Sequence, residues 1–436
     1  MSFEVEKALD SAYVMGTYGR SPVEFVEGRG MRLWDSEGRE YRDFLAGIGV
    51  ACLGYGHPAV ADAVAAQAAR LQHTCNYFYV PGRAETAALL SKLANDDLAG
   101  AGALVAALDA GGAGGGFGSG SSAAVLTAAA PAPGEQVWKT FFANSGAEAN
   151  EGALKLARLY AKRCGNGGNT VVALRGSFHG RTLNTLAATM QDWLQDDFRP
   201  LPGGYVACTP NDVDELRGLF DRLGGEICAV LYEPIQGESG VHPLTVEFME
   251  AMRDLAHGAG ALLVADEVQT GIFRSGKPFA FQTYGVEPDI MSLAKGIAGG
   301  VPMGAFLAKA EVADAFKAGD HGSTFGGSNL AVATSCSVLS ELVRGRYDRR
   351  AAEVGEYFRA RLAAVPHALD VRGAGLMVGC DLDDSVADAH DVVAAALEAG
   401  FVINATGAHT LRFLPPLICE REDVDALIAA LTEILG

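Results

Sequence analysis

The chain has few cysteines, and none is placed for a shared metal or redox function. Eight are scattered between Cys52 and Cys419, with no C-x-x-C pair and no Cys/His spacing that is typical of zinc. Several lie in apolar runs, such as Cys228 and Cys380, where a reduced and buried thiol is expected. We therefore expect no metal site and a reducing compartment, the cytoplasm.

Long apolar runs and an excess of positive charge are also missing. No run of about 18 apolar residues is suited to crossing a bilayer, and the polar residues 1–7 do not resemble a signal peptide. With 34 Lys and Arg against 53 Asp and Glu, the formal net charge is -19, which repels nucleic acids and anionic lipids. We expect neither as a partner, although a few buried arginines could still bind a small anion.

Apolar runs rich in Val, Ile and Leu recur in the middle of the chain, each followed by a helical pattern. This alternation is typical of an α/β fold with a buried, mainly parallel sheet flanked by helices. Strands are predicted at 140–143, 170–174, 229–232, 262–265 and 290–293, with a helix at 147–162. Outside this region the patterns predict a hairpin within 23–44, strands at 376–381 and 411–413, and helices at 331–342, 351–364 and 422–435.

These elements predict two lobes. Residues 61–330 are expected to form a large ligand-binding domain. Residues 1–60 and 331–436, the two ends of the chain, are expected to form a smaller α+β domain together.

Residues 99–136 differ from the rest of the chain, because they are mostly Ala, Gly, Ser and Pro without Lys or Arg. A phosphate-binding loop is one interpretation, but no register completes G-x-G-x-x-G and the basic residue of a P-loop is absent. We therefore predict a flexible surface insertion whose removal leaves activity nearly intact.

Three separated pieces of the central region carry residues suited to chemistry. Ser145 and Gly146 form a small-residue turn between a predicted strand and helix, where backbone N–H groups can bind an anion. Asp266 ends a buried strand, where a carboxylate keeps its charge beside a cation such as a protonated pyridine nitrogen. Lys295 ends another strand just before glycines, and a desolvated lysine amine can react with an aldehyde.

Each piece alone has an ordinary structural explanation: a helix cap, a capping aspartate, or a lysine at a strand end. Together they provide what pyridoxal phosphate needs. The cofactor requires an anchor for its phosphate, a carboxylate for its ring nitrogen and an amine for its aldehyde.

Motifs along nearly the whole chain resemble those of the class III, fold type I, pyridoxal-phosphate aminotransferases. The matching stretches are Leu33–Arg39, Gly54–Pro58, Asn144–Asn150, Phe178–Thr182, Glu233–Glu238, Asp266–Gly271, Lys295–Gly300, His321–Gly327 and Leu411–Pro416. One departure follows Gly327, where the family usually has Asn-Pro and this chain has Ser328-Asn329. Within the match, residues 99–136 stand out as foreign.

The resemblance implies a set of cofactor contacts. Lys295 would hold the cofactor covalently and move the substrate proton, and Asp266 would pair with the ring nitrogen. Gln269 would lie near the ring hydroxyl. The other implied contacts are Ser145, Gly146 and Ala147 at the phosphate, Phe178 on the ring face, and Thr324 at the phosphate of a neighbouring subunit. The last contact implies a homodimer with shared active sites.

The resemblance also implies two arginine sites for substrate carboxylates, because a guanidinium binds a carboxylate through two hydrogen bonds. Arg181, with Ser323, would hold the α-carboxylate of the amino donor. Arg412 would bind the α-carboxylate of glutamate, and Glu238 would pair with Arg412 when that site is empty. Either arginine could instead belong to a structural ion pair. Tyr18 is a further substrate-binding candidate.

Ile48 indicates the kind of donor. Related ornithine aminotransferases carry a tyrosine near this position that helps hold the free α-amino group, whereas isoleucine offers no hydrogen bond. A donor with an acylated α-amine fits better, which favours transamination between N2-acetyl-L-ornithine and 2-oxoglutarate. Succinyl-diaminopimelate and succinylornithine fit the same pocket. Free ornithine, or a pyridoxal-phosphate decarboxylase or mutase, fits less well.

Overall fold

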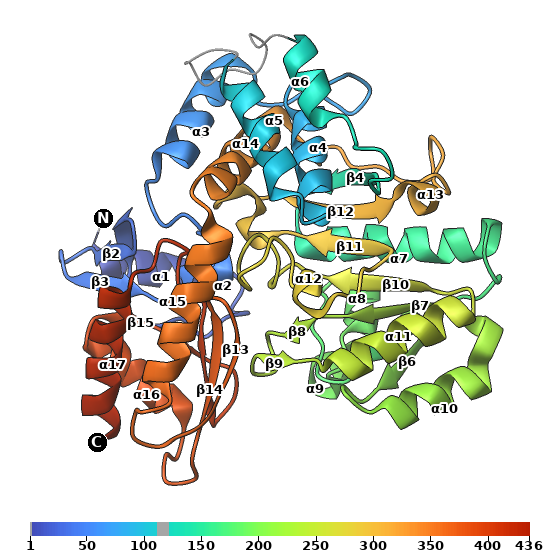
Figure 1. Cartoon of the computed structure of the whole chain (residues 1–436). Coiled ribbons are helices and arrows are strands. Elements are labelled where there is room, and N and C mark those ends of the chain that lie inside the picture. The colour runs from blue at the N-terminus through green and yellow to red at the C-terminus, as the bar shows by residue number, and fades with distance from the viewer. Residues whose placement is uncertain (1, 111–121) are drawn as a thin grey trace.

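The computed structural model describes residues 2–110 and 122–436. Figure 1 shows a lobe built around a large central sheet, and a second lobe of smaller sheets and helices that contains both termini. The α/β class predicted from the sequence is confirmed.

The central sheet has seven strands in the order β4-β12-β11-β10-β7-β5-β6. Their bounds are β4 Trp138–Ala143, β5 Thr170–Leu174, β6 Tyr205–Cys208, β7 Ile227–Tyr232, β10 Leu262–Asp266, β11 Ile290–Leu293 and β12 Gly304–Lys309. The five strands from β11 to β6 are parallel, and β12 runs antiparallel to both β11 and β4. All five predicted strands are present within two residues of their predicted bounds, whereas β6 and β12 were not predicted.

Both faces of this sheet are buried, which explains why its strands are continuous apolar runs. Neighbouring residues of β10 point to opposite faces: Leu263 and Ala265 join one hydrophobic core, and Leu262 and Val264 join another. The helices of this lobe include α7 Gly146–Arg163, α8 Leu183–Ala188, α9 Asp192–Gln195, α10 Val213–Leu223, α11 Val246–Gly258, α12 Phe281–Tyr284 and α13 Ala310–Ala313. In Figure 1 they lie on both sides of the sheet.

The second lobe joins the two chain ends through one pair of strands. β15 (Phe401–Val402) pairs in parallel with β3 (Glu40–Asp43), next to β2 (Arg32–Asp35) and β1 (Phe25–Arg29). A further sheet contains β13 Ala368–Ala374, β14 Met377–Leu382, β17 Thr410–Phe413 and β16 Asn404–Ala405. The helices here are α1 Phe3–Tyr13, α2 Ala46–Gly49, α15 Tyr347–Leu362, α16 Ala389–Glu398 and α17 Arg421–Leu435. The exact domain bounds stay a prediction.

The prediction that residues 99–136 form one flexible insertion is wrong for most of the segment. α5 (Leu98–Asp109) buries Ala101, Leu104 and Val105, and it packs beside α4 (Arg83–Ala94) and α14 (Asn329–Arg344), with α3 (Pro58–Arg70) nearby. α6 spans Ser122–Ala129. In the sequence, the high Ala and Gly content hides the apolar face of a helix, although that face is long enough to pack against neighbouring helices. The glycine-rich centre, 111–120, lies outside the described residues.

The end of the same segment is also tied to the core. Lys92 Nζ donates to Ala130 O at 3.0 Å and to Glu135 Oε2 at 2.7 Å, with only 6% of the Lys92 side chain exposed. A buried ammonium is stable only when it is paired in this way.

Three further observations concern the thiols, possible metal sites and the lengths of the apolar helices. All eight cysteines are free thiols, six of them buried. Across residues 2–110 and 122–436, no three His, Cys, Asp or Glu side chains gather as a metal site would require. In the same residues, no helix is both long and apolar enough to span a membrane.

Candidate active site

The central sheet ends in a cavity of about 490 Å³. Its walls come from the carboxyl ends of the strands and the segments that follow them, and they include Gly146 after β4, Phe178 after β5, Glu233 after β7, Asp266 at the end of β10 and Lys295 after β11. Ligands of open α/β sheets bind in this place because the strand ends leave a crevice there. The three sequence pieces that suggested chemistry therefore meet in one cavity.

Lys295 sits in an uncommon backbone conformation. It begins a 3-10 turn, Lys295–Ala298, with φ +49°, which a non-glycine residue rarely adopts. Strain of this kind is often found at functional sites. Removal of the ammonium from bulk water lowers the Lys295 pKa, while the nearby Glu238 charge opposes that shift. The amine therefore loses its proton more readily than an ordinary lysine and is a better nucleophile.

Asp266 is held by three hydrogen bonds and is only 3% exposed. Its Oδ2 lies 2.7 Å from His179 Nδ1 and accepts from Asn150 Nδ2 at 2.7 Å, and its Oδ1 accepts from Val268 N at 3.0 Å. Burial alone would raise the Asp266 pKa, but the hydrogen bond and charge of His179 lower it below its usual value. Asp266 thus keeps its charge in a buried place, as a partner of a ring N–H⁺ must.

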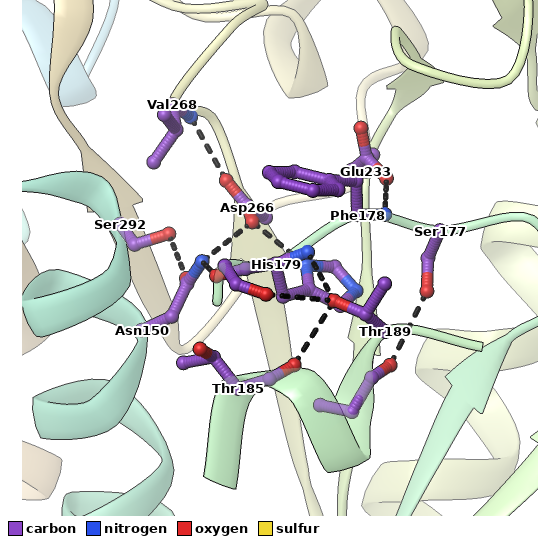
Figure 2. Close-up of polar contacts among 12 residues, drawn as sticks. Asn150, Ser177, Phe178, His179, Thr185, Thr189, Glu233, Asp266, Val268 and Ser292 are labelled. Carbon is purple, nitrogen blue, oxygen red and sulfur yellow. Dashed lines mark hydrogen bonds and ion pairs between the residues drawn. The ribbon is translucent and has the colours of Figure 1, made fainter. Parts of the chain in front are cut away.

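Figure 2 shows that this carboxylate belongs to a larger polar network. Asn150 also donates to His179 O at 2.8 Å, and Ser292 Oγ donates to Asn150 Oδ1 at 2.5 Å. No role was predicted for His179, Asn150 or Ser292. Asn150 could have been found, because on a helix it lies one turn after Gly146 and faces the same side.

The first turn of α7 forms a cradle for an anion. Ser145 is the N-cap, and its Oγ accepts from Glu148 N at 3.2 Å. The first N–H groups of a helix have no acceptor within the helix, so they can donate to an anion at this wall of the cavity. A Cβ at Gly146 would come within 2.9 Å of Val268 Cγ1, which leaves no room for a side chain. Ala147 lines the same wall.

The predicted ring contacts also line the cavity. Phe178 presents its side chain there, and Gln269 Nε2 donates to Glu238 Oε1 at 3.0 Å. Gln269 Oε1 is buried and has no partner among the described residues, so an acceptor remains for a ligand hydroxyl. The cradle, the charged Asp266, this free acceptor and the Lys295 amine fit the phosphate, ring nitrogen, hydroxyl and aldehyde of pyridoxal phosphate.

Arg412 is closed off by Glu238. Only 2% of the Arg412 side chain is exposed, and its Nη1 lies 2.8 Å from Glu238 Oε1. Asn404 Oδ1 accepts from the other side of the guanidinium, at 2.8 and 3.1 Å. Burial would raise the Glu238 pKa, but the charges of Arg412 and Lys295 lower it, so Glu238 stays ionised.

Arg181 lies at the open side of the cavity. It is exposed, and its guanidinium carbon is 5.4 Å from the centroid of the Phe178 ring. It makes no ion pair with any described residue, which leaves it available for a carboxylate. One arginine is thus free at the rim, and the other is buried and paired.

Five predicted site residues do not line the cavity of the single chain. They are Tyr18, Ile48, Ser323, Thr324 and Arg412, the last of which is buried and paired with Glu238. Ser323 Oγ accepts from Asn144 Nδ2 at 3.2 Å and from Gly326 N at 3.0 Å, whereas Thr324 and Tyr18 are exposed. Ile48 is 40% exposed and lies two residues from Val50, which does line the cavity. The roles of these five, like those of the other predicted site residues, stay predictions.

A family model and several known proteins match this chain over nearly its whole length. The family model "Aminotransferase class-III" matches residues 14–112 and 118–435. That match is interrupted within the segment 99–136, at residues 113–117. That the segment is foreign to the family stays a prediction. The acetylornithine aminotransferase of Methanocaldococcus jannaschii is 41% identical over 434 residues, which cover 98% of this chain and 96% of the relative.

Solved structures agree in fold over the whole chain. An ornithine aminotransferase of Toxoplasma gondii aligns with a TM-score of 0.82 and 29% identity, covering 100% of this chain and 94% of that one. An acetylornithine aminotransferase of Elizabethkingia anophelis aligns with a TM-score of 0.78 and 26% identity, covering 100% and 99%. With the lysine, the aspartate and the anion cradle in place, the chain belongs to the class III aminotransferases, enzymes of fold type I that use pyridoxal phosphate.

Proposed function

We propose that the chain transfers the δ-amino group of N2-acetyl-L-ornithine to 2-oxoglutarate, giving N-acetyl-L-glutamate 5-semialdehyde and L-glutamate in arginine biosynthesis. The observation that carries the proposal is the ion pair of Arg412 with Glu238, whose carboxylate lines the cavity of Lys295. A site that alternates between two substrates needs a carboxylate clamp that can be neutralised for the donor and opened for glutamate. The names of relatives about 40% identical over nearly their full length support the same reaction.

Pyridoxal phosphate, when bound, supplies an electrophilic carbon for the amine and an electron sink for the deprotonated substrate. Lys295 would hold its aldehyde, and the first turn of α7 would hold its phosphate. Asp266, kept charged by His179, would hold the ring nitrogen proton. Lys295 Nζ, with its lowered pKa, can then take the substrate proton and return it.

Substrate orientation would come from the two arginines. Arg181 at the rim would bind the carboxylate of the donor while Glu238 keeps Arg412 neutralised. For glutamate, Glu238 would leave Arg412, which then binds the α-carboxylate through its planar fork. Asn404 would keep the guanidinium in place throughout, because its Oδ1 accepts from the Nε and Nη2 groups that face away from Glu238.

The proposal includes a homodimer with shared active sites. It is supported by a group of exposed aromatic residues beside Thr324: Tyr77 (94% exposed), Phe78 (66%), Tyr79 (101%) and Phe325 (63%). Asn76 Nδ2 donates to Ser323 O at 2.6 Å, so the two segments that carry these residues lie side by side. Apolar groups this exposed are typical of a surface that another subunit covers. The free thiols fit a reducing cytoplasm, which is also part of the proposal.

The decisive experiment is a panel of amino donors with 2-oxoglutarate, read as glutamate formed. We expect the highest kcat/KM with N2-acetyl-L-ornithine, followed by succinylornithine and succinyl-diaminopimelate, and a much lower value with free ornithine. A clear preference for free ornithine would contradict the acyl donor. If no glutamate formed with any of these donors, the reaction class itself would be contradicted.

A further inference from the structure

Glu233 is a buried carboxylate in the cavity wall that has no role in the proposed reaction. It directly follows β7, lines the cavity and is 5% exposed. Burial raises its pKa to about 7, while the His179 charge and two backbone N–H donors oppose that rise. Burying a carboxylate in such a place costs free energy, which its hydrogen bonds have to offset.

One Glu233 oxygen holds the segment that carries the exposed arginine. Oε1 accepts from Phe178 N at 2.9 Å, a contact visible in Figure 2. Phe178 and Arg181 belong to the same short segment between β5 and α8, and the Arg181 guanidinium lies over the Phe178 ring. The position of Arg181 therefore depends on where the Phe178 backbone is held.

The other Glu233 oxygen holds the segment that carries Glu238, the carboxylate paired with the buried Arg412. Oε2 accepts from Gly237 N at 3.2 Å. Gly237 O accepts from Arg412 Nη1 at 3.1 Å, and the next residue is Glu238. A Cβ at Gly237 would come within 2.0 Å of Gln269 Oε1, so this backbone is packed tightly against the cavity wall.

We propose that Glu233 is a positioning residue that fixes the spacing between the two carboxylate sites, Arg181 and Arg412. Its two oxygens connect the Phe178 segment with the Gly237–Glu238 segment. No other described side chain accepts hydrogen bonds from the backbone N–H groups of both segments. The inference rests on the proposed function and adds that Arg181 takes the second carboxylate of a five-carbon diacid that is held at Arg412 by the first. A fixed spacing selects that chain length over shorter and longer diacids.

Glu233→Gln tests this connection with little change in shape. The amide keeps one acceptor oxygen, but its NH₂ cannot accept from a backbone N–H, so one of the two ties is lost. Glu233→Asp keeps both acceptors on a shorter stem and serves if the amide variant folds poorly. Glu267→Gln is the matched control, because Glu267 is also buried and accepts from Ala280 N and Phe281 N, yet does not line the cavity.

The measurement is calorimetric binding of succinate, glutarate and adipate to the holoenzyme, none of which can be transaminated. We expect the wild type and Glu267→Gln to bind glutarate best. In Glu233→Gln the preference for glutarate should fall by roughly two- to tenfold, the range expected for one hydrogen bond. Steady-state kinetics should show the same change as a raised KM for 2-oxoglutarate, with kcat altered much less. Glu233→Asp should retain more of the preference than Glu233→Gln.

Three results would overturn the proposal. The first is an unchanged preference in both Glu233 variants, and the second is an equal loss in Glu267→Gln, which would mean that any buried carboxylate matters as much. A wild-type enzyme that uses 2-oxoglutarate but binds the three diacids alike would also overturn it. Failure of the proposed function gives a different outcome, because the wild type would then form no glutamate with any donor.

Discussion

His179 Nδ1 lies 2.7 Å from Asp266 Oδ2, and the two side chains are 0% and 3% exposed. Neither group would be stable there alone, because a buried carboxylate tends to take up a proton and a buried imidazole needs an acceptor. The contact lowers the Asp266 pKa against the effect of burial. Whether the cofactor meets a charged carboxylate therefore depends on a histidine that it need not touch.

Asp266→Asn should keep the fold and bound cofactor but slow the half-reaction with glutamate by about 100-fold or more, because a neutral amide cannot stabilise a ring N–H⁺. The rate is read in a stopped-flow instrument from the visible absorption of the holoenzyme. Asp254→Asn, on the exposed part of α11, is the control. An unchanged rate in the Asp266 variant would rule out this partner.

His179→Leu should make the same half-reaction sensitive to mild acid. A carboxylate with a lowered pKa keeps its charge until the pH falls through that folded value, so wild-type Asp266 stays charged well below neutral pH. Without His179, burial dominates and raises the Asp266 pKa, so the loss of rate should begin at a higher pH. Rates measured from pH 8 to 5 check this, and superimposable profiles of the two proteins would contradict it.

Lys295→Ala should fold normally and lose turnover by about 1,000-fold or more, because both the amine that holds the cofactor and the proton carrier are removed. Circular dichroism checks the fold, and the donor panel checks turnover. Lys277→Ala is a control, since Lys277 pairs with Asp96 and lies outside the cavity. Substantial turnover in the Lys295 variant would mean that another base serves the reaction.

The structure of α5 predicts where the segment 99–136 can be changed. Leu104 is 0% exposed, so Leu104→Ala should lower the free energy of unfolding by about 2–5 kcal/mol. Leu126 on α6 is 72% exposed, and Leu126→Ala should change it by less than about 0.5 kcal/mol. Urea unfolding compares the two variants. Equal stability would restore the idea that the segment is dispensable.

Much of the sheet could be predicted because its strands are short apolar runs, each followed by a helical pattern, and such runs are typical of buried parallel strands. Ile290–Leu293 and Thr170–Leu174 agree with the predicted bounds at both ends. β12 was missed because Gly304–Lys309 follows a glycine-rich turn and contains two alanines, which weakens the strand pattern. α5 was missed for a related reason: its alanines and glycines resemble a linker until three of its residues are seen to be buried.

The part of the site that could be predicted was a combination of residues. Asp266 ends one apolar strand and Lys295 closely follows another, and only together with the Ser145–Gly146 turn do they meet the needs of one cofactor. His179 and Ser292 act through partners 87 and 142 residues away in sequence, and no local pattern reveals these contacts. Glu233 is similar, because its importance comes from two backbone N–H groups on different segments.

Ile48 offers the sharpest test of the donor. It has φ +65°, next to Gly47 at +61° and Gly49 at +76°, and a β-branched residue is rarely found in this region. The turn therefore holds the Ile48 side chain in a set direction, 40% exposed and two residues from the cavity-lining Val50. Backbone strain of this kind is common at functional sites, so we expect the Ile48 side chain to contact a ligand or a neighbouring subunit rather than the protein core.

Ile48→Tyr should favour free ornithine, whose ammonium can donate to the new hydroxyl, and should disfavour acetylornithine, whose acyl group the ring crowds. A gained hydrogen bond or a clash of this kind is worth about 1–3 kcal/mol, or roughly a tenfold to hundredfold change in relative kcat/KM. Ile48→Leu is the control, because it keeps an apolar side chain without β-branching and so separates backbone strain from the hydroxyl. The measurement is kcat/KM for both donors with 2-oxoglutarate saturating. If the ratio changes equally in both variants, strain rather than hydrogen bonding governs the site, and if it changes in neither, position 48 does not select the donor.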